Sequence, residues 1–324
     1  MRRFIAITCV AATILLGLAG ATGVAQAKVP GRNGDIVFIR TSSSGNNRMF
    51  VVDPVSGKLH RLMFPFGVDS PHWSPDGTTI AFNSGLDAVC PPTCVGHTVI
   101  IDPGTGQYRI LPAATPRLFT SCTIWSPDAS HFACEGGNDS KPRLNGVYTI
   151  RSSDGRGLMR ITDANGMSDI PIDYSPDGSQ LVFGRVGPDD SCTKRSALYV
   201  VSVEGSGLHR ITPWRFCDDD GSWSPDGRWI AFEHRGSIFE VHPNGGGLRR
   251  IALKTKSRSF AGDISWSPDG EQLAFILFLK TGPHTFVGGL GTANTNGTDV
   301  HQLTVTPGSN FDHEGDWGAS PPAS

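Results

Sequence analysis

One five-residue pattern recurs along the chain at nearly regular intervals. It is an aromatic residue followed by Ser-Pro-Asp-Gly, and it occupies positions 73–77, 125–129 (with Ala in place of Gly), 174–178, 223–227 and 266–270. A degraded sixth copy begins at Trp317, and successive aromatic residues are 52, 49, 49, 43 and 51 residues apart. A period of this length is typical of stacked supersecondary units, each of which needs its neighbours to bury its apolar surface.

The pattern has the chemistry of a tight turn. Proline presets the first corner, the Asp side chain can bond its own backbone two residues on, and Gly accepts a left-handed conformation. The preceding aromatic ring is suited to filling the gap between neighbouring sheets. We therefore predict structural roles for the aromatic and acidic residues of each copy, which are Trp73, Asp76, Trp125, Asp128, Tyr174, Asp177, Trp223, Asp226, Trp266 and Asp269.

Between the turns, each unit has the pattern of four short strands. The strand after each turn is apolar on both faces, as in Leu181-Val182-Phe183, which is required of a sheet packed between two others. Three strands are expected before the first signature, at 35–40, 48–53 and 58–62, and one at about 312–317 after the last full repeat. Forty Gly, 23 Pro and the lack of a helical period beyond the N-terminal segment predict an all-β protein.

The full repeat reads Trp-Ser-Pro-Asp-Gly-x-x-Ile-Ala-Phe, then a strand, then Gly-x-x-Arg-Ile-Thr. It resembles the TolB-like propeller repeat, a WD-repeat-like four-stranded blade, over nearly the whole chain after the N-terminal segment. The resemblance implies a six-bladed β-propeller of four-stranded antiparallel blades. With the four strands of a blade lettered A to D, A being the strand before the signature turn, the N-terminal B, C and D strands (35–40, 48–53 and 58–62) and a C-terminal A strand (about 312–317) would together close the ring. The expected organisation is a signal peptide (1–27), a short leader (28–34), the propeller (35–318) and a C-terminal tail (319–324).

The N-terminus has the pattern of a secretory signal. Arg2 and Arg3 precede an apolar run, and Ala25-Gln26-Ala27 offers a cleavage site, so we expect cleavage after Ala27 and an exported, periplasmic or extracellular protein. The apolar run is short for a membrane span, and no later run is long enough, so no span is expected after cleavage. The remaining 26 basic and 30 acidic residues give a formal charge of −4, which gives no basic footprint for nucleic acid. A monomer is expected.

Six cysteines remain after the signal, namely Cys90, Cys94, Cys122, Cys134, Cys192 and Cys217. An even number in an exported protein favours disulfides over a metal site, since no second Cys or His pair follows at zinc spacing. Six cysteines allow 15 pairings, and the sequence does not choose among them. Candidate pairs are Cys90–Cys94, Cys122–Cys134 and Cys192–Cys217.

Motifs for catalysis are missing from the sequence. It contains neither Gly-x-Ser-x-Gly nor His-Glu-x-x-His, and the repeated serines of the signature are better explained as turn residues. Accordingly, we expect no enzymatic activity and no cofactor, although Ca²⁺ could bind where carboxylates gather.

Acidic residues stand just ahead of five of the six signature aromatics, on the loops expected at one mouth of the central channel. Together with two neighbouring histidines, the candidate ligand-binding residues are Asp69, His72, Asp169, Asp219, Asp220, Asp263, Asp312, His313 and Glu314. A mouth lined by one sign of charge concentrates the opposite charge, so a basic peptide segment or a cation is the expected ligand. The alternative is that Asp is simply common in loops and at the starts of strands.

The resemblance implies a module that binds an exported protein or peptide around its channel. A second hypothesis is an enzyme that uses the channel mouth as its active site, such as a metal-dependent polysaccharide lyase or a lactonase. His72, His313 and Glu314 are the residues at the inner mouth that suit it. A third is a structural or sensor domain with no ligand of its own.

Overall fold

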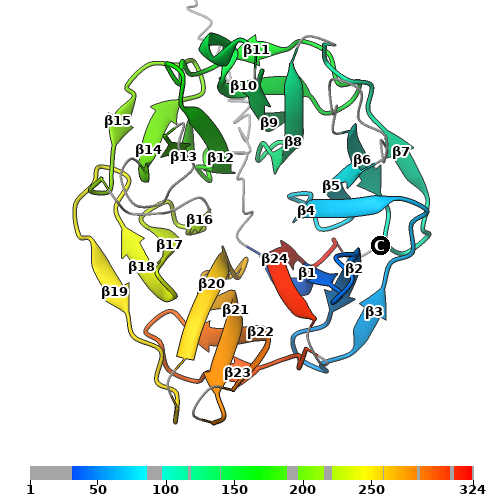
Figure 1. The fold of residues 1–324 in the computed structure, drawn as a ribbon, viewed down its shortest axis with the longest axis vertical. Helices are drawn as coiled ribbons and strands as arrows, with labels where there is room; N and C mark the ends of the chain where they lie inside the picture. The colour runs from blue at the N-terminus through cyan, green and yellow to red at the C-terminus, as the bar shows by residue number, and fades with distance from the viewer. Residues whose placement is uncertain are drawn as a thin grey trace, which may run out of the picture.

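The computed structural model describes residues 31–85, 97–115, 118–138, 140–187, 196–214, 221–257, 259–282, 285–306 and 310–322. These residues form six four-stranded antiparallel sheets, arranged as blades around a central axis (Figure 1). The architecture confirms the all-β, six-bladed propeller predicted from the repeat. The signal peptide expected at 1–27 lies outside the described residues.

The first three blades follow in order around the ring. Blade 1 contains β24 (Phe311–Ala319), β1 (Asn33–Thr41), β2 (Asn47–Val52) and β3 (Leu59–Arg61). Blade 2 contains β4 (Gly67–Trp73), β5 (Ile80–Gly85), β6 (His97–Ile101) and β7 (Tyr108–Ile110). Blade 3 contains β8 (Phe119–Trp125), β9 (His131–Gly137), β10 (Gly146–Arg151) and β11 (Met159–Arg160), with a 3₁₀ turn, η1 (Pro142–Leu144), between β9 and β10.

The other three blades complete the ring. Blade 4 contains β12 (Ser168–Tyr174), β13 (Gln180–Val186), β14 (Ser196–Ser202) and β15 (His209–Arg210). Blade 5 contains β16 (Gly221–Trp223), β17 (Ile230–His234), β18 (Ser237–Val241) and β19 (Arg249–Ile251). Blade 6 contains β20 (Ser259–Trp266), β21 (Gln272–Lys280), β22 (Phe286–Asn294) and β23 (His301–Gln302).

The second strand of each blade carries the core. Its apolar residues pack against both neighbouring blades, and one aromatic position recurs fully buried as Phe38, Phe82, Phe183, Phe232 and Phe275. Burying one such side chain contributes about 1.5–3 kcal/mol. In blade 3 this position is Cys134, which is also fully buried.

The signature turns are held by their own side chains. In the first, Ser74 Oγ donates to Asp76 Oδ1 over 2.6 Å, and the backbone N–H of Thr78 donates to the same oxygen over 3.1 Å. Burial alone would raise the pKa of Asp76, but these hydrogen bonds outweigh it and hold the pKa below its usual range. Asp128 and Asp177 have pKa values lowered in the same way.

The ring closes between the two ends of the described chain. β24 pairs with β1, and Trp317 Nε1 donates to the Gly34 carbonyl oxygen over 3.0 Å. Four strands from two ends of the sequence therefore make blade 1, as the repeat predicts. β1 begins at Asn33, two residues before the predicted start.

Packing also explains why the sixth signature departs from the repeat. Gly318 stands where the other copies have Ser, and a Cβ there would lie 2.5 Å from Cγ of the Trp73 ring. The glycine lets the aromatic residue of blade 2 pack directly onto the closing strand.

We therefore expect Gly318→Ala to destabilise the protein by about 1–3 kcal/mol, the usual cost of overpacking. Urea denaturation gives the free energy of unfolding, and Trp73→Leu in the same chain should recover part of the loss. Gly262→Ala is the matched control on another channel strand, because its Cβ would approach only Glu233 Cγ at 3.8 Å. Equal effects of the two glycine substitutions would contradict this explanation.

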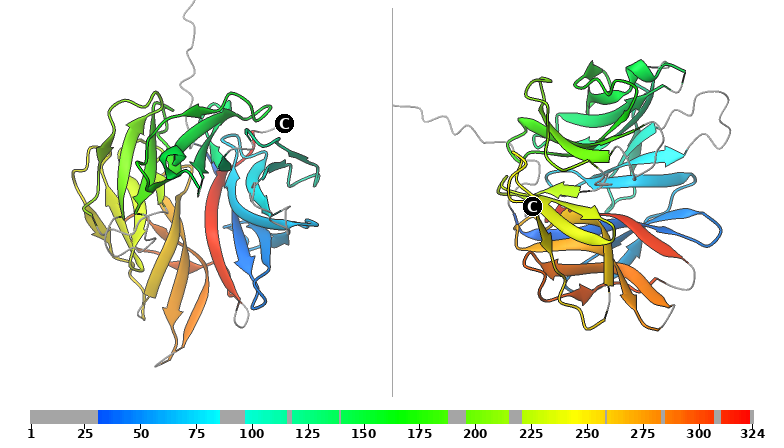
Figure 2. Two further views of the ribbon diagram at one scale, coloured as in Figure 1. Left: turned by 45° about the horizontal axis from the view of Figure 1, so that its top comes forward. Right: turned by 60° about the vertical axis from the view of Figure 1, so that its left-hand side comes forward.

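The strands run between two faces of the ring (Figure 2). The signature turns lie on one face, after the innermost strands β4, β8, β12, β16, β20 and β24 have ended. The beginnings of these innermost strands lie on the opposite face, which is the face seen in Figure 1. We call the opening on that face the mouth.

Candidate functional site

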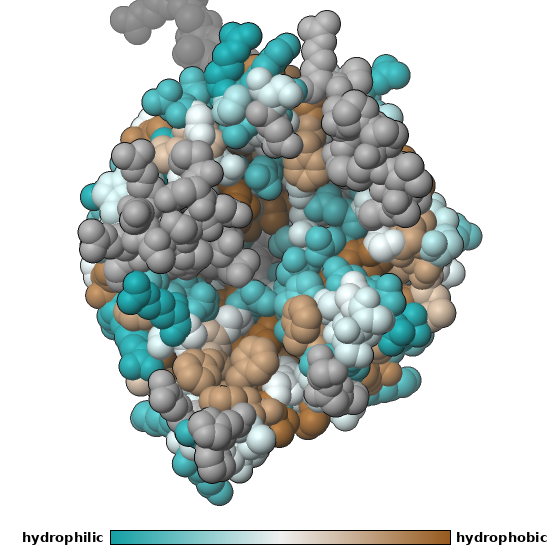
Figure 3. Space-filling model, in the orientation of Figure 1, coloured by the Kyte–Doolittle hydropathy of each residue, from teal (hydrophilic) through white to brown (hydrophobic). Residues whose placement is uncertain are grey.

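A cavity of about 180 Å³ lies at the mouth of the channel. Carboxylates line part of it, contributed by Asp263, Glu314 and Glu135, and isoleucines line another part, at positions 124, 170, 172 and 264. Figure 3 shows the hollow at the centre of this face, with hydrophilic side chains over β4 and hydrophobic ones toward β12. The cavity therefore offers both charge and apolar surface to a ligand.

The acidic side of the cavity is built on kinked channel strands. β4, β20 and β24 each contain a register shift three residues before the aromatic, where Ser70, Asp263 and Glu314 have φ of 49°, 51° and 54°. A left-handed backbone at a non-Gly residue is uncommon and costs energy. The kink presents the backbone N–H groups and side chains of these residues to each other across blades 6, 1 and 2.

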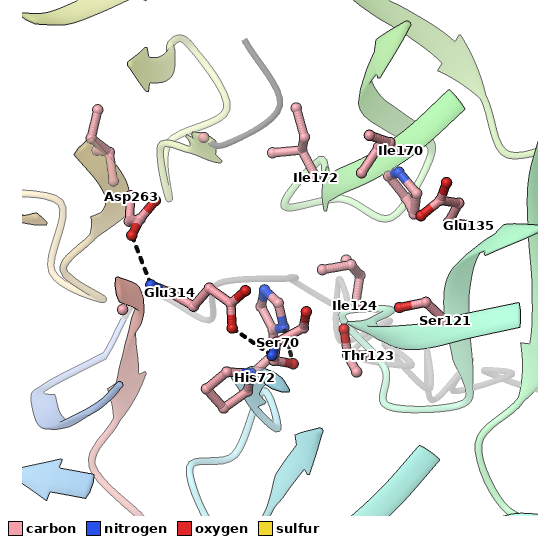
Figure 4. A pocket seen from close by; sticks show the side chains of 15 residues that line it. Ser70, His72, Ser121, Thr123, Ile124, Glu135, Ile170, Ile172, Asp263 and Glu314 are labelled. Atoms are coloured by element: carbon pink, nitrogen blue, oxygen red, sulfur yellow. Dashed lines mark hydrogen bonds between the residues drawn. The ribbon is translucent and has the colours of Figure 1, made fainter. Parts of the chain in front are cut away.

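These residues are joined in a relay of hydrogen bonds (Figure 4). The backbone N–H of Ser70 donates to Glu314 Oε2 over 2.6 Å, and that of Glu314 donates to Asp263 Oδ2 over 2.8 Å. His72, which also lines the cavity, places Nδ1 3.2 Å from the Ser70 carbonyl oxygen. Three blades are thus tied together at the mouth.

Asp69 and His313 influence the pKa of Glu314. Burial, followed by the charge of Glu314 and a hydrogen bond to it, raises the pKa of Asp69 to about 7. Burial alone would raise the pKa of Glu314, but its bonds with His313 and Asp69 outweigh this and lower it. Burial alone would likewise lower the pKa of His313, yet Glu314, with Nδ1 and Oε1 3.7 Å apart, raises it.

No family model matches the chain. An uncharacterized protein of Agrobacterium fabrum is 28% identical over 213 residues, which are 54% of this chain and 68% of that protein. The TolB structure from Acinetobacter baumannii superposes with a TM-score of 0.64 at 17% identity, covering 89% of this chain and 67% of that one. A TolB structure from Agrobacterium tumefaciens gives 0.62 at 19% identity, over 89% and 100%. The chain has the TolB-like propeller fold.

A lyase structure is also similar in fold, at a lower TM-score. The oligogalacturonate lyase structure from Vibrio parahaemolyticus gives a TM-score of 0.56 at 14% identity, covering 88% of this chain and 79% of that one. At such identities the likeness shows the fold alone, so the site of this TolB-like propeller has to be judged from its own residues.

Two of the predicted mouth residues of the TolB-like propeller have buried carboxylates that do not line the cavity. Asp169 is 0% exposed and Asp312 is 2% exposed, and both form two hydrogen bonds with a buried arginine of the next strand. Arg185 bonds Asp169 at 2.6 and 2.7 Å, and Arg40 bonds Asp312 at 2.5 and 2.8 Å. These two carboxylates are therefore held in buried ion pairs and do not line the cavity.

The reason is their position on the strand. Asp169 and Asp312 stand five residues before the aromatic, whereas Asp263 and Glu314 stand three before it, on the other side of the register shift. Each buried Asp also accepts from a Thr of the preceding blade, Thr162 Oγ1 at 2.6 Å or Thr304 Oγ1 at 3.0 Å. At these two boundaries, a Thr just after the outermost strand of one blade is thus bonded to the next blade.

Sequence reasoning missed Glu135. It comes from β9, after the signature turn, whereas the predicted mouth residues all stand before an aromatic of the signature. The sequence does contain a signal for this position. The polar residues Asn83 and Glu233 stand at the same distance after their signature aromatics, in β5 and β17. Asp219 and Asp220 lie outside the described residues.

Both residues of one predicted cysteine pair are among the described residues. Cys122 and Cys134 face each other across β8 and β9, with Cα atoms 4.1 Å apart and their sulfurs bonded. Both are buried. Cys90, Cys94, Cys192 and Cys217 lie outside the described residues, so their pairings stay predictions.

Within the described part of the chain, no three His, Cys, Asp or Glu side chains are grouped as a metal-binding set. In that same part, no helix has the length and apolar character needed to cross a membrane.

Proposed function

We propose that this protein is an exported binding module whose channel mouth takes a cationic segment of a protein or peptide. The observation that carries the proposal is the composition of the mouth cavity, where three carboxylates and four isoleucines share about 180 Å³. A lysine or arginine side chain has an apolar stem and a charged head, so it can contact both kinds of wall. Carboxylates of one sign also attract such a ligand from a distance.

The rest of the mouth face suits a macromolecular ligand. Phe286 and Phe311 are 44% and 47% exposed, and Phe286 packs against Phe260 with ring centroids 5.4 Å apart. Figure 3 shows hydrophobic surface over β20–β22 beside the hollow. Exposed aromatic residues around a polar pocket are a common feature of protein interfaces. The signal-like N-terminal sequence supports export.

The test is affinity capture with the purified protein from culture fluid and envelope fractions, followed by affinity measurement with the captured partner. We expect Asp263→Asn with Glu314→Gln to weaken binding about tenfold or more, equivalent to about 1.4 kcal/mol, and added salt to weaken wild-type binding. Asp35→Asn is the matched control on the turn face and should bind normally. The mass of the native protein should show whether it begins at Lys28.

Capture of no partner by the wild-type protein, or equal capture by the mouth variant, would refute the proposal. A second outcome would replace it with catalysis. The structural neighbours include an oligogalacturonate lyase in complex with manganese, so oligogalacturonate is assayed with Mn²⁺ and with Ca²⁺. Metal-dependent cleavage that the mouth variant loses would make the protein an enzyme.

A further inference from the structure

A groove on the turn face runs between blades 5 and 6, which are neighbours in the ring (Figure 1). It is bounded by the signature turns of these blades, by the outermost strand β19 and by the turn at 295–296 that follows β22. Its volume is about 720 Å³, and it shares no lining residue with the mouth cavity. Sites of about 300–1,000 Å³ are typical for small-molecule ligands, so the groove has room for a ligand of several rings.

Two residues of blade 5 depart from the repeat, and both line this groove. Trp229 stands where the other four full copies of the signature have Thr, His or Gln. Glu240 is the register partner of Ala231, at a position that is Ile, Thr or Val in every other blade. The four-stranded blade therefore forms without either residue, and departures from a local pattern are typical of functional sites.

Together these two residues fix one guanidinium group in the groove. The Glu240 side chain is 5% exposed, and Arg249 Nε donates to Glu240 Oε1 over 2.5 Å. The Arg249 Cζ atom lies 4.4 Å from the centroid of the Trp229 ring, and the His242 ring stacks on Trp229 with centroids 3.7 Å apart. Because a buried carboxylate is costly unless it is paired, Glu240 holds Arg249 in place. Among the described residues, no other side chain binds its two Nη groups, which are suited to the two oxygens of a ligand carboxylate.

The other charges of the groove are separated by sign. Arg250 and Lys254 are exposed, and neither has a carboxylate partner within the described part of the chain. The acidic lining residues besides Glu240 are Asp226 and Asp269, which belong to the signature turns and each accept from the Ser of the same turn over 2.6 Å. The groove therefore has a cationic side along and just beyond β19 and an acidic side at the turns.

This combination of groups suits a sugar that carries carboxylates. A carboxylate can accept from the guanidinium groups, while sugar hydroxyls can donate to the turn carboxylates. Asn296 adds a neutral group, since the Thr298 backbone N–H donates to its Oδ1 over 3.0 Å and its amide NH₂ remains as a donor. A polymer of phosphates would bring negative charge against Asp226 and Asp269, whereas a uronate chain places hydroxyls between its carboxylates.

We propose that the groove between blades 5 and 6 is a second binding site, which takes an acidic oligosaccharide with its carboxylates on Arg249 and Arg250. The site lies on the face opposite the mouth, so it does not rest on the function proposed for the mouth.

The test is titration calorimetry of the full-length protein with trimannuronate and with trigalacturonate, in EDTA so that no metal-dependent cleavage consumes the sugar. At least one of the two should bind, and mannotriose, which has the sugar units of trimannuronate without the carboxylates, should not. Arg250→Gln should weaken binding about tenfold, which is the usual effect of losing one hydrogen bond to a charged group. Arg61→Gln is the matched control, because Arg61 faces Phe50 in blade 1 as Arg250 faces Phe239 in blade 5.

A second variant removes the fixed guanidinium without leaving a buried charge unpaired. Arg249→Met with Glu240→Val installs residue types that other blades have at these positions, so it should fold, and it should also bind about tenfold more weakly. In the wild type, the Trp229 indole N–H resonance, assigned by its absence in Trp229→Phe, should shift as the sugar is added.

The mouth variant, Asp263→Asn with Glu314→Gln, should bind the sugar like the wild type, which separates this site from the mouth. The proposal is wrong if neither sugar binds below about 1 mM, or if mannotriose binds as tightly as trimannuronate. It is also wrong if the mouth variant loses binding while Arg250→Gln keeps it. Tighter binding of polyglutamate or single-stranded DNA than of either sugar would overturn the assignment to a saccharide.

Discussion

Asp169→Asn is expected to destabilise the propeller by about 3–5 kcal/mol, although the substitution changes almost no volume. The amide cannot neutralise Arg185, whose guanidinium lies buried over Phe183 and Tyr199 at 5.6 and 5.0 Å from their ring centroids. Removing one partner of a buried ion pair leaves the other charge desolvated and uncompensated, which explains the size of the loss. Whole domains are stable by only about 5–15 kcal/mol, so much of the total would be lost.

Urea denaturation followed by tryptophan fluorescence gives the free energy of unfolding for this variant. Replacing both partners, as Asp169→Asn with Arg185→Met, should recover part of the loss, because no unpaired charge then remains. The control is Asp163→Asn, since that side chain is 70% exposed in its ion pair with Arg160 and exposed pairs contribute little. A loss at Asp169 no larger than the loss at Asp163 would show that Arg185 finds water or another partner.

Removing the Cys122–Cys134 disulfide should lower the free energy of unfolding by about 3 kcal/mol. The two residues are 12 apart in sequence, and a link of that span restricts the unfolded chain by about this amount. Differential scanning calorimetry of Cys122→Ala with Cys134→Ala should therefore show a lower melting temperature than the wild type. The smaller alanine side chains add a cavity cost of their own.

Adding a reductant distinguishes the stability lost with the disulfide from the stability lost through the smaller alanine side chains. Melting the wild type with reductant present should lower its transition, while the double variant should show a smaller response to the same reductant. Equal responses would assign the effect to the other four cysteines and would mean that the Cys122–Cys134 pair contributes no stability.

The fold could be predicted because its repeated features are local. A Ser-Pro-Asp-Gly turn between an aromatic residue and an apolar strand depends on residues within one short segment, and five clear copies with a degraded sixth indicate six blades. The partition of blade 1 between the two ends of the chain followed from counting strands.

The site was only partly predictable because it depends on small shifts within a strand. Asp263 and Asp312 are both acidic residues ahead of an aromatic, yet they stand three and five positions from it, on opposite sides of a register shift that the sequence does not mark. One reaches the cavity and the other reaches Arg40. The hydrogen bond from the Ser70 backbone N–H to Glu314 joins residues 244 positions apart in the sequence, and no local pattern indicates it.

The closing strand β24 has a consequence for how the protein folds. It carries Asp312 of a buried ion pair, Glu314 of the mouth and Trp317 of the blade packing, so closure and mouth are completed by the same nine residues. Until β24 pairs with β1, blade 1 lacks its innermost strand and the cavity lacks Glu314. The ring and the mouth are therefore completed in the same folding step.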